Sequence, residues 1–123
     1  MLRTIFTGTI ICLFSIVSVK AQLVYAPKLS CVTNGQDVNG DDYVRLIWTV
    51  PVNTCGPFNA YYIYRASSFN GPYGLVYTET NQAATSYDDY GATGTVYYFM
   101  VSDFNCPGGT FLHSDTVDNL DPV

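Results

Sequence analysis

The sequence predicts an all-β domain, a sandwich of seven strands, and three observations lead to this prediction. Short segments in which apolar and polar residues alternate recur through residues 29–117, with turn-forming residues about every 8–12 positions. Tyrosine and phenylalanine, which favour strands, number 11 and 7 among the 123 residues. Beyond residue 21, no segment has the apolar period of an amphipathic helix.

Residues 1–21 have the pattern of a secretory signal peptide. Arg3 supplies the positive start, residues 5–19 are apolar, and Val19 and Ala21 are small residues ahead of a cleavage site. A transmembrane anchor is the alternative, but the apolar run is short for a span and no charge cluster follows it. We therefore expect cleavage before Gln22, followed by secretion or display at the cell surface.

Removing the first 21 of 123 residues leaves 102, which is enough for one domain over residues 22–123. This part contains three basic residues (Lys28, Arg45 and Arg65) and ten acidic ones, so its net charge is −7. Binding to phosphate groups needs a basic surface. The composition therefore excludes nucleic acid and anionic membrane surfaces as partners. We expect no membrane insertion after signal removal, and the oligomeric state stays open.

The chain is organised around two expected strands, of which the first covers residues 43–49. Val44, Leu46 and Trp48 share one face of this strand. Trp48, the only tryptophan, suits the centre of a small core. Pro51 ends the strand because it has no N–H to donate.

The second strand, residues 60–65, follows a turn over residues 52–59 that is rich in Asn, Gly and Pro. Alternation gives it two different faces, with Tyr61, Ile63 and Arg65 on one and Tyr62 and Tyr64 on the other.

Five further strands are expected around this pair. They cover residues 29–33, 75–79, 85–88, 95–102 and 111–117. Polar and glycine-bearing turns separate them, and Asn70-Gly71 is a strong hairpin signal. Residues 118–123 are expected to form a polar tail.

The pattern resembles a fibronectin type III domain over essentially all of residues 22–123. The motifs that carry the resemblance are, in chain order, Pro27 and Leu29, Trp48, Tyr61-x-Ile63-Tyr64-Arg65, Gly71-Pro72-Tyr73, Thr85-x-Tyr87 and Tyr97-x-Phe99-x-Val101. The resemblance implies an immunoglobulin-like sandwich. It also makes Tyr97 the candidate for the tyrosine corner, whose hydroxyl closes onto backbone upstream of its strand.

A narrower likeness comes from short motifs along the same chain. LxCV, WxxP, TCGxF, YxIY, GPY, YYF, a Cys-Pro-Gly-Gly loop and SDT together are similar to domains at the front of secreted gliding-motility-associated proteins of Bacteroidetes. That resemblance implies delivery to the cell surface by the type IX secretion system and a longer chain with a C-terminal sorting domain. This sequence ends at Val123, so a fragment and a lone periplasmic module are the alternatives.

Three cysteines, Cys31, Cys55 and Cys106, remain once Cys12 leaves with the signal peptide. Export favours disulfides, and an odd number leaves at least one thiol free. In the fold that the resemblance implies, the Cys55 turn and the Cys106 loop lie at the same end. We expect these two to pair and to close a loop of about 50 residues, worth roughly 4 kcal/mol. Cys31 is a competing partner, and if free it is expected to be a small buried apolar residue.

No metal or cofactor site is expected, because the cysteines and the single histidine lack ligand spacing. Asp37-x-Asn39-x-Asp41 resembles the start of a calcium loop. Its sixth position, however, is Asp42 where glycine is needed, and its twelfth is Trp48 where an acidic residue is needed. A solvated turn is the expectation, and calcium binding by this turn is left open.

The sequence does not predict an enzyme. His113 and Ser114 are neighbours on an expected strand, so their side chains point to opposite faces and cannot form a nucleophile–base pair. The sequence also shows no carboxylate pair, phosphate-binding loop or nucleophile motif. We therefore predict a non-catalytic module.

The candidate binding surface is aromatic. In the implied fold the strands at 60–65 and 95–102 are neighbours. Tyr62, Tyr64 and Tyr98 are expected to face outward together, as is Met100. An exposed aromatic patch often binds a partner, although cross-strand pairing alone also explains outward tyrosines.

A second candidate surface is the loop end of the domain, with Phe58, Phe104 and residues 107–109. The expected function is that of a spacer or a protein-interaction and adhesion module with an unidentified partner. The alternative is a carbohydrate-binding module that uses the face with Tyr62, Tyr64 and Tyr98.

Overall fold

The computed structural model describes residues 22–120, so the predicted signal peptide lies outside the described residues. This part of the chain forms nine strands and no helix. The strands are β1 (Gln22–Val24), β2 (Lys28–Gln36), β3 (Asp42–Thr49), β4 (Phe58–Ala66), β5 (Gly74–Glu79), β6 (Ser86–Asp89), β7 (Tyr97–Phe104), β8 (Gly109–Phe111) and β9 (Val117–Asp118). Residues 22–120 accordingly contain no helix that is long and apolar enough to cross a membrane.

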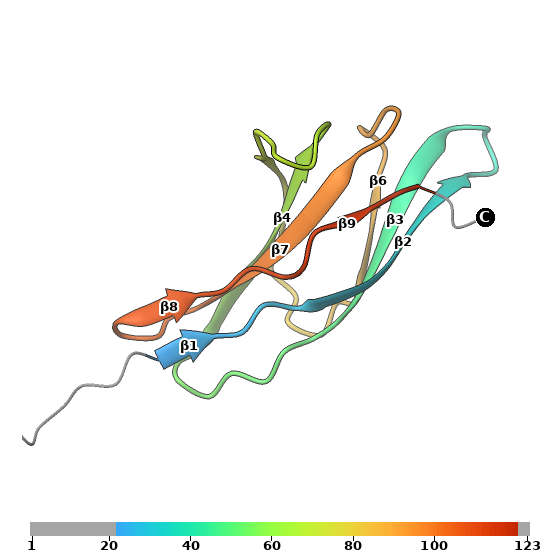
Figure 1. Ribbon diagram of the computed structural model, residues 1–123. Helices are drawn as coiled ribbons and strands as arrows, with labels where there is room; N and C mark the ends of the chain where they lie inside the picture. The colour runs from blue at the N-terminus through green and yellow to red at the C-terminus, as the bar shows by residue number, and fades with distance from the viewer. Residues whose placement is uncertain (1–21, 121–123) are drawn as a thin grey trace, which may run out of the picture.

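Two sheets lie face to face in a sandwich (Figure 1). One has the strand order β2-β3-β6 and the other has the order β5-β4-β7-β9, and every strand pair within them is antiparallel. These seven strands confirm the predicted sandwich. β1 and β8 form a separate parallel pair at one end of the molecule, which the sequence did not predict (Figure 1).

The core between the sheets is centred on Trp48, which is 2% exposed. Its ring contacts Tyr61 of the opposite sheet edge-on, at a centroid distance of 6.5 Å. Tyr61 and Ile63 are fully buried, as the alternation on β4 predicts. The Nε1 atom of Trp48 has no hydrogen-bond partner within the described residues. Apolar burial therefore holds this ring, at about 1.5–3 kcal/mol for a large side chain.

The prediction that Tyr98 and Met100 face outward is wrong, because both side chains are completely buried. The register explains their position: Tyr98 lies opposite Arg65, and Met100 lies opposite Ile63. Directly opposed residues share a face, and Ile63 faces the core. Both faces of β7 carry apolar residues, so alternation alone does not say which face is the inner one.

The last expected strand, residues 111–117, is interrupted. Between β8 and β9 only an isolated bridge joins His113 to Val101. Next to this bridge, Ser114 Oγ accepts a hydrogen bond from the Met100 N–H (2.8 Å), while the Ser114 N–H donates to the Met100 carbonyl (2.8 Å). A side-chain oxygen thus takes the place of a backbone carbonyl, and the regular ladder stops there.

Cys31 is half-buried, so the prediction that it is a buried apolar residue is wrong. A bulge at Ser30 breaks the alternation of β2. Leu29 therefore lies opposite Trp48 on the core side, whereas Cys31 lies opposite Ile47 on the solvent side.

Candidate interaction surface

The outer face of the four-stranded sheet carries a cluster of rings. Phe99 of β7 is at its centre, with its ring centroid 4.9 Å from Tyr64, 4.9 Å from Tyr73 and 5.0 Å from His113. We call these four residues the outer aromatic cluster. Tyr64 and Phe99 are direct partners in the register of β4 and β7, and their rings are stacked with an interplanar angle of 15°. The pairing of the two strands therefore builds the base of the cluster.

Two exposed apolar side chains border the outer aromatic cluster. Leu75 of β5 lies opposite Tyr64 and is 52% exposed. Phe69 is 61% exposed, and its ring lies 6.0 Å from that of Tyr97. Apolar surface therefore extends from the edge strand β5 across β4 to β7.

The loop between β4 and β5 positions Tyr73 on this surface. Gly71 has a φ of +89°, a conformation that strains residues with a side chain, and its N–H donates to the Ser68 carbonyl (2.9 Å). The Tyr73 hydroxyl donates to the carbonyl of Phe69 (2.8 Å). The turn that Asn70-Gly71 predicts therefore also places an aromatic ring.

Tyr62 lies on the same outer face as Tyr64, as predicted, and is half-buried. Its hydroxyl donates to Asp103 Oδ2 (3.2 Å), and Asn59 Nδ2 donates to the same oxygen (2.7 Å). Burial and the hydrogen bond to Asp103 raise the pKa of Tyr62. This tyrosine is thus held against the sheet at the end where Asp103 supplies a negative charge.

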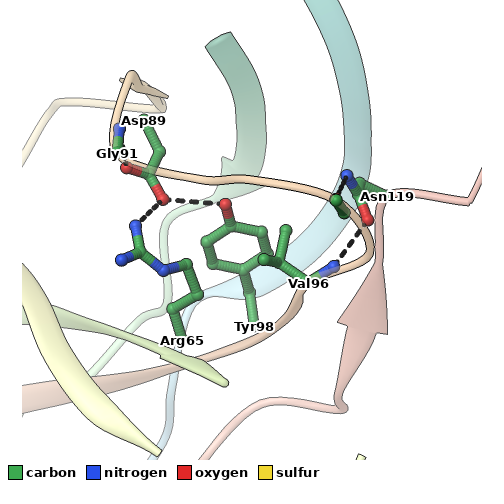
Figure 2. Close-up of polar contacts among 7 residues, drawn as sticks. Arg65, Asp89, Gly91, Val96, Tyr98 and Asn119 are labelled. Atoms are coloured by element: carbon green, nitrogen blue, oxygen red, sulfur yellow. Dashed lines mark hydrogen bonds and ion pairs between the residues drawn. The ribbon is translucent and has the colours of Figure 1, made fainter. Parts of the chain in front are cut away.

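Tyr98, the third residue of the predicted face, instead belongs to a buried polar network (Figure 2). Its hydroxyl donates to Asp89 Oδ2 (2.8 Å), and Arg65 Nη1 lies 2.7 Å from the same atom. The Gly91 N–H donates to the other carboxylate oxygen (3.0 Å). Burial, followed by the bond to Asp89, raises the pKa of Tyr98. Tyr98 is therefore no part of a binding face.

The tyrosine-corner candidate is also affected by the wrong assignment of the two faces of β7. Tyr97 lies on the outer face, half-buried, with its ring against Phe69. The buried tyrosine at the start of β7 is Tyr98, and its hydroxyl closes onto the Asp89 side chain, not onto backbone. The prediction that Tyr97 forms a tyrosine corner is therefore wrong, and Tyr98 makes a side-chain contact in its place.

A second polar brace is built around Asn119, just after β9, within the segment where only a polar tail was expected (Figure 2). Asn119 is buried, and its Oδ1 accepts a hydrogen bond from the Val96 N–H (2.8 Å). Its Nδ2 donates to Asn34 Oδ1 and to the Gly94 carbonyl, both at 3.0 Å. No spacing rule marks an asparagine that joins three segments distant in sequence, so sequence reasoning missed it.

Cys55 and Cys106 form a disulfide with a Cα–Cα distance of 5.1 Å, as predicted. Gly56 follows closely, and a Cβ atom there would collide with the carbonyl of Asn105. Glycine is therefore needed next to the bridge. Phe58 and Phe104 pack against each other at 5.3 Å, and Phe104 is buried. Phe104 is therefore no part of the aromatic surface predicted for this end of the domain, and Phe58 is only partly exposed.

Comparisons with known proteins address the fold. No protein-family model matches this chain, and no curated protein sequence matches it either. A crystal structure of a Fn3-like protein from Clostridium thermocellum is similar, with 23% identity, a TM-score of 0.55, and coverage of 81% of this chain and 95% of that one. The sixth fibronectin type III domain from human fibronectin type III domain containing protein 3 matches at 16% identity and a TM-score of 0.56, covering 88% of this chain and 92% of that domain.

This chain has the fibronectin type III fold. Identities this low show the fold alone and transfer no function. A site of this domain therefore follows from the chemistry of its own residues.

In the acidic turn between β2 and β3, the carboxylate of Asp37 makes its hydrogen bonds within the domain. Asp37 Oδ1 accepts hydrogen bonds from the N–H groups of Asn39 (2.9 Å) and Asp41 (3.0 Å), and Oδ2 accepts one from the Tyr90 hydroxyl (3.3 Å). Among residues 22–120, no group of three or more His, Cys, Asp or Glu side chains is placed to hold a metal ion. The turn is built as an Asx turn that closes on itself.

His113 and Ser114, the neighbours considered as a catalytic pair, each make contacts that hold the fold. Ser114 is 9% exposed, and its hydroxyl donates to the Asp115 carbonyl (3.0 Å) while accepting from Met100. His113 Nδ1 lies 3.1 Å from the Ser114 carbonyl, and its ring contacts Phe99. His113 therefore belongs to the aromatic surface, a role that sequence reasoning missed because the bridge to Val101 falls outside any regular strand.

A groove of about 630 Å³ separates the loop at residues 92–95 from the ends of β2 and β3. Among the described residues, Asp42 is the only charged side chain that lines it, beside Tyr43 and Asn119. The lining that the structure describes provides no pair of groups suited to acid–base or metal chemistry, so the outer aromatic cluster is the candidate site of this domain.

Proposed function

We propose that this protein is a non-catalytic secreted or cell-surface module that acts as a spacer or a protein-interaction and adhesion domain, with the outer aromatic cluster as its contact surface. The observation that carries the proposal is the apolar surface from Leu75 across Tyr64 to Phe99, bordered by the exposed ring of Phe69. Exposed apolar surface of this kind is typical of sites that bind partners.

Cross-strand pairing explains part of this surface but not all of it. The stacked pair of Tyr64 and Phe99 stabilises the sheet by itself. Phe69 and Leu75, however, are each more than half exposed to water. Covering them by a partner would recover free energy at roughly 25 cal/mol per Å² of apolar area.

Carbohydrate binding ranks second because of the ring geometry. A sugar stacks on the open face of an aromatic ring, whereas Tyr64 and Phe99 turn their faces toward each other. Tyr98, which was predicted to belong to the sugar-binding face, is buried in the core. No contact in residues 22–120 favours a glycan over a protein partner.

Export of the protein is part of the proposal. The signal-peptide pattern of residues 1–21 and the Cys55–Cys106 disulfide support an extracytoplasmic location. The motif likeness to Bacteroidetes gliding-motility-associated proteins supports delivery to the cell surface. Intact-mass measurement of the exported native product tests this: cleavage before Gln22 and a mass two hydrogens below the reduced value are expected. A product that keeps residues 1–21 would overturn the export proposal.

Binding of the exported protein to intact cells of its source organism tests the function. Purified protein with its disulfide intact is labelled at its amino terminus and incubated with the cells. We expect binding that the Phe69→Ser/Leu75→Ser variant loses. The control variant Ile47→Ser/Val52→Ser changes exposed apolar residues elsewhere and should keep it.

Protease treatment of the cells separates the partner classes. Loss of binding after proteolysis supports a protein partner, whereas loss only after glycosidase treatment supports the carbohydrate alternative. Equal binding by both variants would rule out the outer aromatic cluster as the contact surface.

A further inference from the structure

We infer that the outer aromatic cluster takes an extended segment of a partner protein that has a basic residue near each end and apolar residues between them. This inference rests on the proposed function and specifies the chemistry of the partner. It comes from the position of charged groups around the rings.

Two carboxylates flank the aromatic surface at its two ends. Asp103 lies at one end of β7, where it accepts hydrogen bonds from Tyr62 and Asn59. Asp118 of β9 lies opposite Tyr97, at the other end of β7. Tyr97 and Asp103 are six positions apart, which corresponds to roughly 20 Å along a strand. Phe99 and its neighbouring rings occupy the space between.

No lysine or arginine among residues 22–120 lies on this outer face. The Arg45 guanidinium is on the outer face of the other sheet, 2.7 Å from Asp88. Arg65 pairs with Asp89 inside the sandwich. Lys28 is the first residue of β2, which belongs to the three-stranded sheet. Among residues 22–120, the carboxylates at the two ends of the rings therefore have no basic neighbour on the outer face of their own sheet.

The charge of the whole domain favours a basic partner. Residues 22–120 carry three basic and nine acidic side chains, a net charge of −6. Two of the acidic side chains are in ion pairs, with Arg45 and Arg65. Such a surface repels a second copy of this chain and steers basic segments toward it.

Arginine and lysine suit both parts of the surface. Their aliphatic stems can cover ring edges, while the charged head reaches a carboxylate. The stacked rings of Tyr64 and Phe99 present edges outward, which apolar side chains of the partner would cover. In an extended segment, alternate residues face the domain, so two basic residues six positions apart would match the two carboxylates.

Titrations of the exported protein with three synthetic peptides, followed by amide NMR shifts, test this. The probe is Arg-Thr-Leu-Thr-Leu-Thr-Arg. One control peptide replaces both Arg by Glu, and another replaces both by Ser. We expect the Arg peptide to shift the amide signals of β4 and β7 around Tyr64 and Phe99. It should bind about tenfold more tightly than the Ser peptide, whereas the Glu peptide should not bind.

A matched pair of variants separates local from general electrostatics. Asp103→Asn/Asp118→Asn should remove the advantage of the Arg peptide over the Ser peptide. Asp41→Asn/Asp42→Asn changes the net charge equally, in the turn between β2 and β3, and should preserve that advantage. Equal effects of the two variants, or shifts centred on residues 37–42, would overturn the inference.

The remaining outcomes distinguish this inference from the proposed function. If the Ser and Arg peptides bound equally well at the cluster, the proposal of a protein-binding surface would stand. The inference that the partner segment is basic would fail. If no peptide shifts the cluster while the cells still require Phe69 and Leu75, the proposed function stands and the inference fails. If neither peptides nor cells require the cluster, both fail.

Discussion

Neighbouring strands are joined by charge on one outer face of the sandwich and by rings on the other. On the three-stranded sheet, the Arg45 guanidinium donates to both carboxylate oxygens of Asp88, at 2.7 and 2.9 Å, and lies 5.1 Å from the Tyr43 ring. On the four-stranded sheet, Tyr64 and Phe99 stack in the same kind of cross-strand position. Both pairs bridge two adjacent strands on the solvent side.

The two faces differ in the free energy that is gained when a partner removes them from water. An ion pair at the surface keeps its hydration and gains little from being covered, because burial removes water from both charges. Half-buried rings gain from every additional area of apolar surface that is removed from water. A partner would therefore gain more on the outer aromatic cluster than on the face with Arg45, and three measurements probe this contrast.

The largest effect is expected from Phe99→Ala. Phe99 contacts the rings of Tyr64, Tyr73 and His113, so its loss should lower the free energy of unfolding by about 2 kcal/mol. Ile47→Ala on the other outer face removes a side chain that is 39% exposed and should cost less than about 1 kcal/mol. Urea denaturation with the disulfide intact measures both. Equal losses would mean that the rings act as isolated surface residues.

A smaller effect is expected from Asp88→Asn. Exposed ion pairs contribute about 0–1 kcal/mol, so the variant should lose no more than this, and less at high salt. The hydrogen bond from Arg45 holds the pKa of Asp88 below its usual value. The pair therefore stabilises the fold above the pKa of the unfolded chain, about 3.9, and loses this effect as the pH falls through the lower folded value.

Denaturation of wild type and Asp88→Asn between neutral and strongly acidic pH checks the prediction. The difference between the two proteins should disappear on the acid side. A difference that grows with acidification would contradict the assignment of Asp88 as the ionised partner of Arg45.

The smallest effect is expected from Tyr62→Phe. The change removes one hydroxyl that donates to Asp103, whose carboxylate keeps the bond from Asn59. The expected loss is about 0.5–1 kcal/mol, as for a single hydrogen bond. The same urea titration measures it. A loss larger than that of Phe99→Ala would show that polar contacts, and not rings, hold the outer face.

Sequence reasoning succeeded where the two faces of a strand differ in polarity. On β3, Val44, Leu46 and Trp48 alternate with mostly polar residues, and all three are buried. It failed on β7, because Tyr98 and Met100 are no more apolar than Phe99. Only the pairing with β4 decides which set faces the core, and pairing is a property of the whole fold.

The candidate site was predicted in part. Alternation on β4 placed Tyr62 and Tyr64 outward. Tyr73 and His113 joined the surface through a loop and an isolated bridge, which no period describes. The bulge that turns Cys31 outward and the brace made by Asn119 depend on contacts between distant segments, so a local pattern does not reveal them.

The disulfide would have a mechanical consequence if the domain acts as the proposed spacer and carries tension. Cys55 and Cys106 are 51 positions apart in the chain, so the bridge takes that segment out of any path along which tension is carried. If the ends were pulled until the strands separated, the disulfide would prevent this segment from extending. The length withheld is about 170 Å, at roughly 3.3–3.6 Å per residue. A tether built from this domain would lengthen by only part of its chain under load, until a reductant released the remainder.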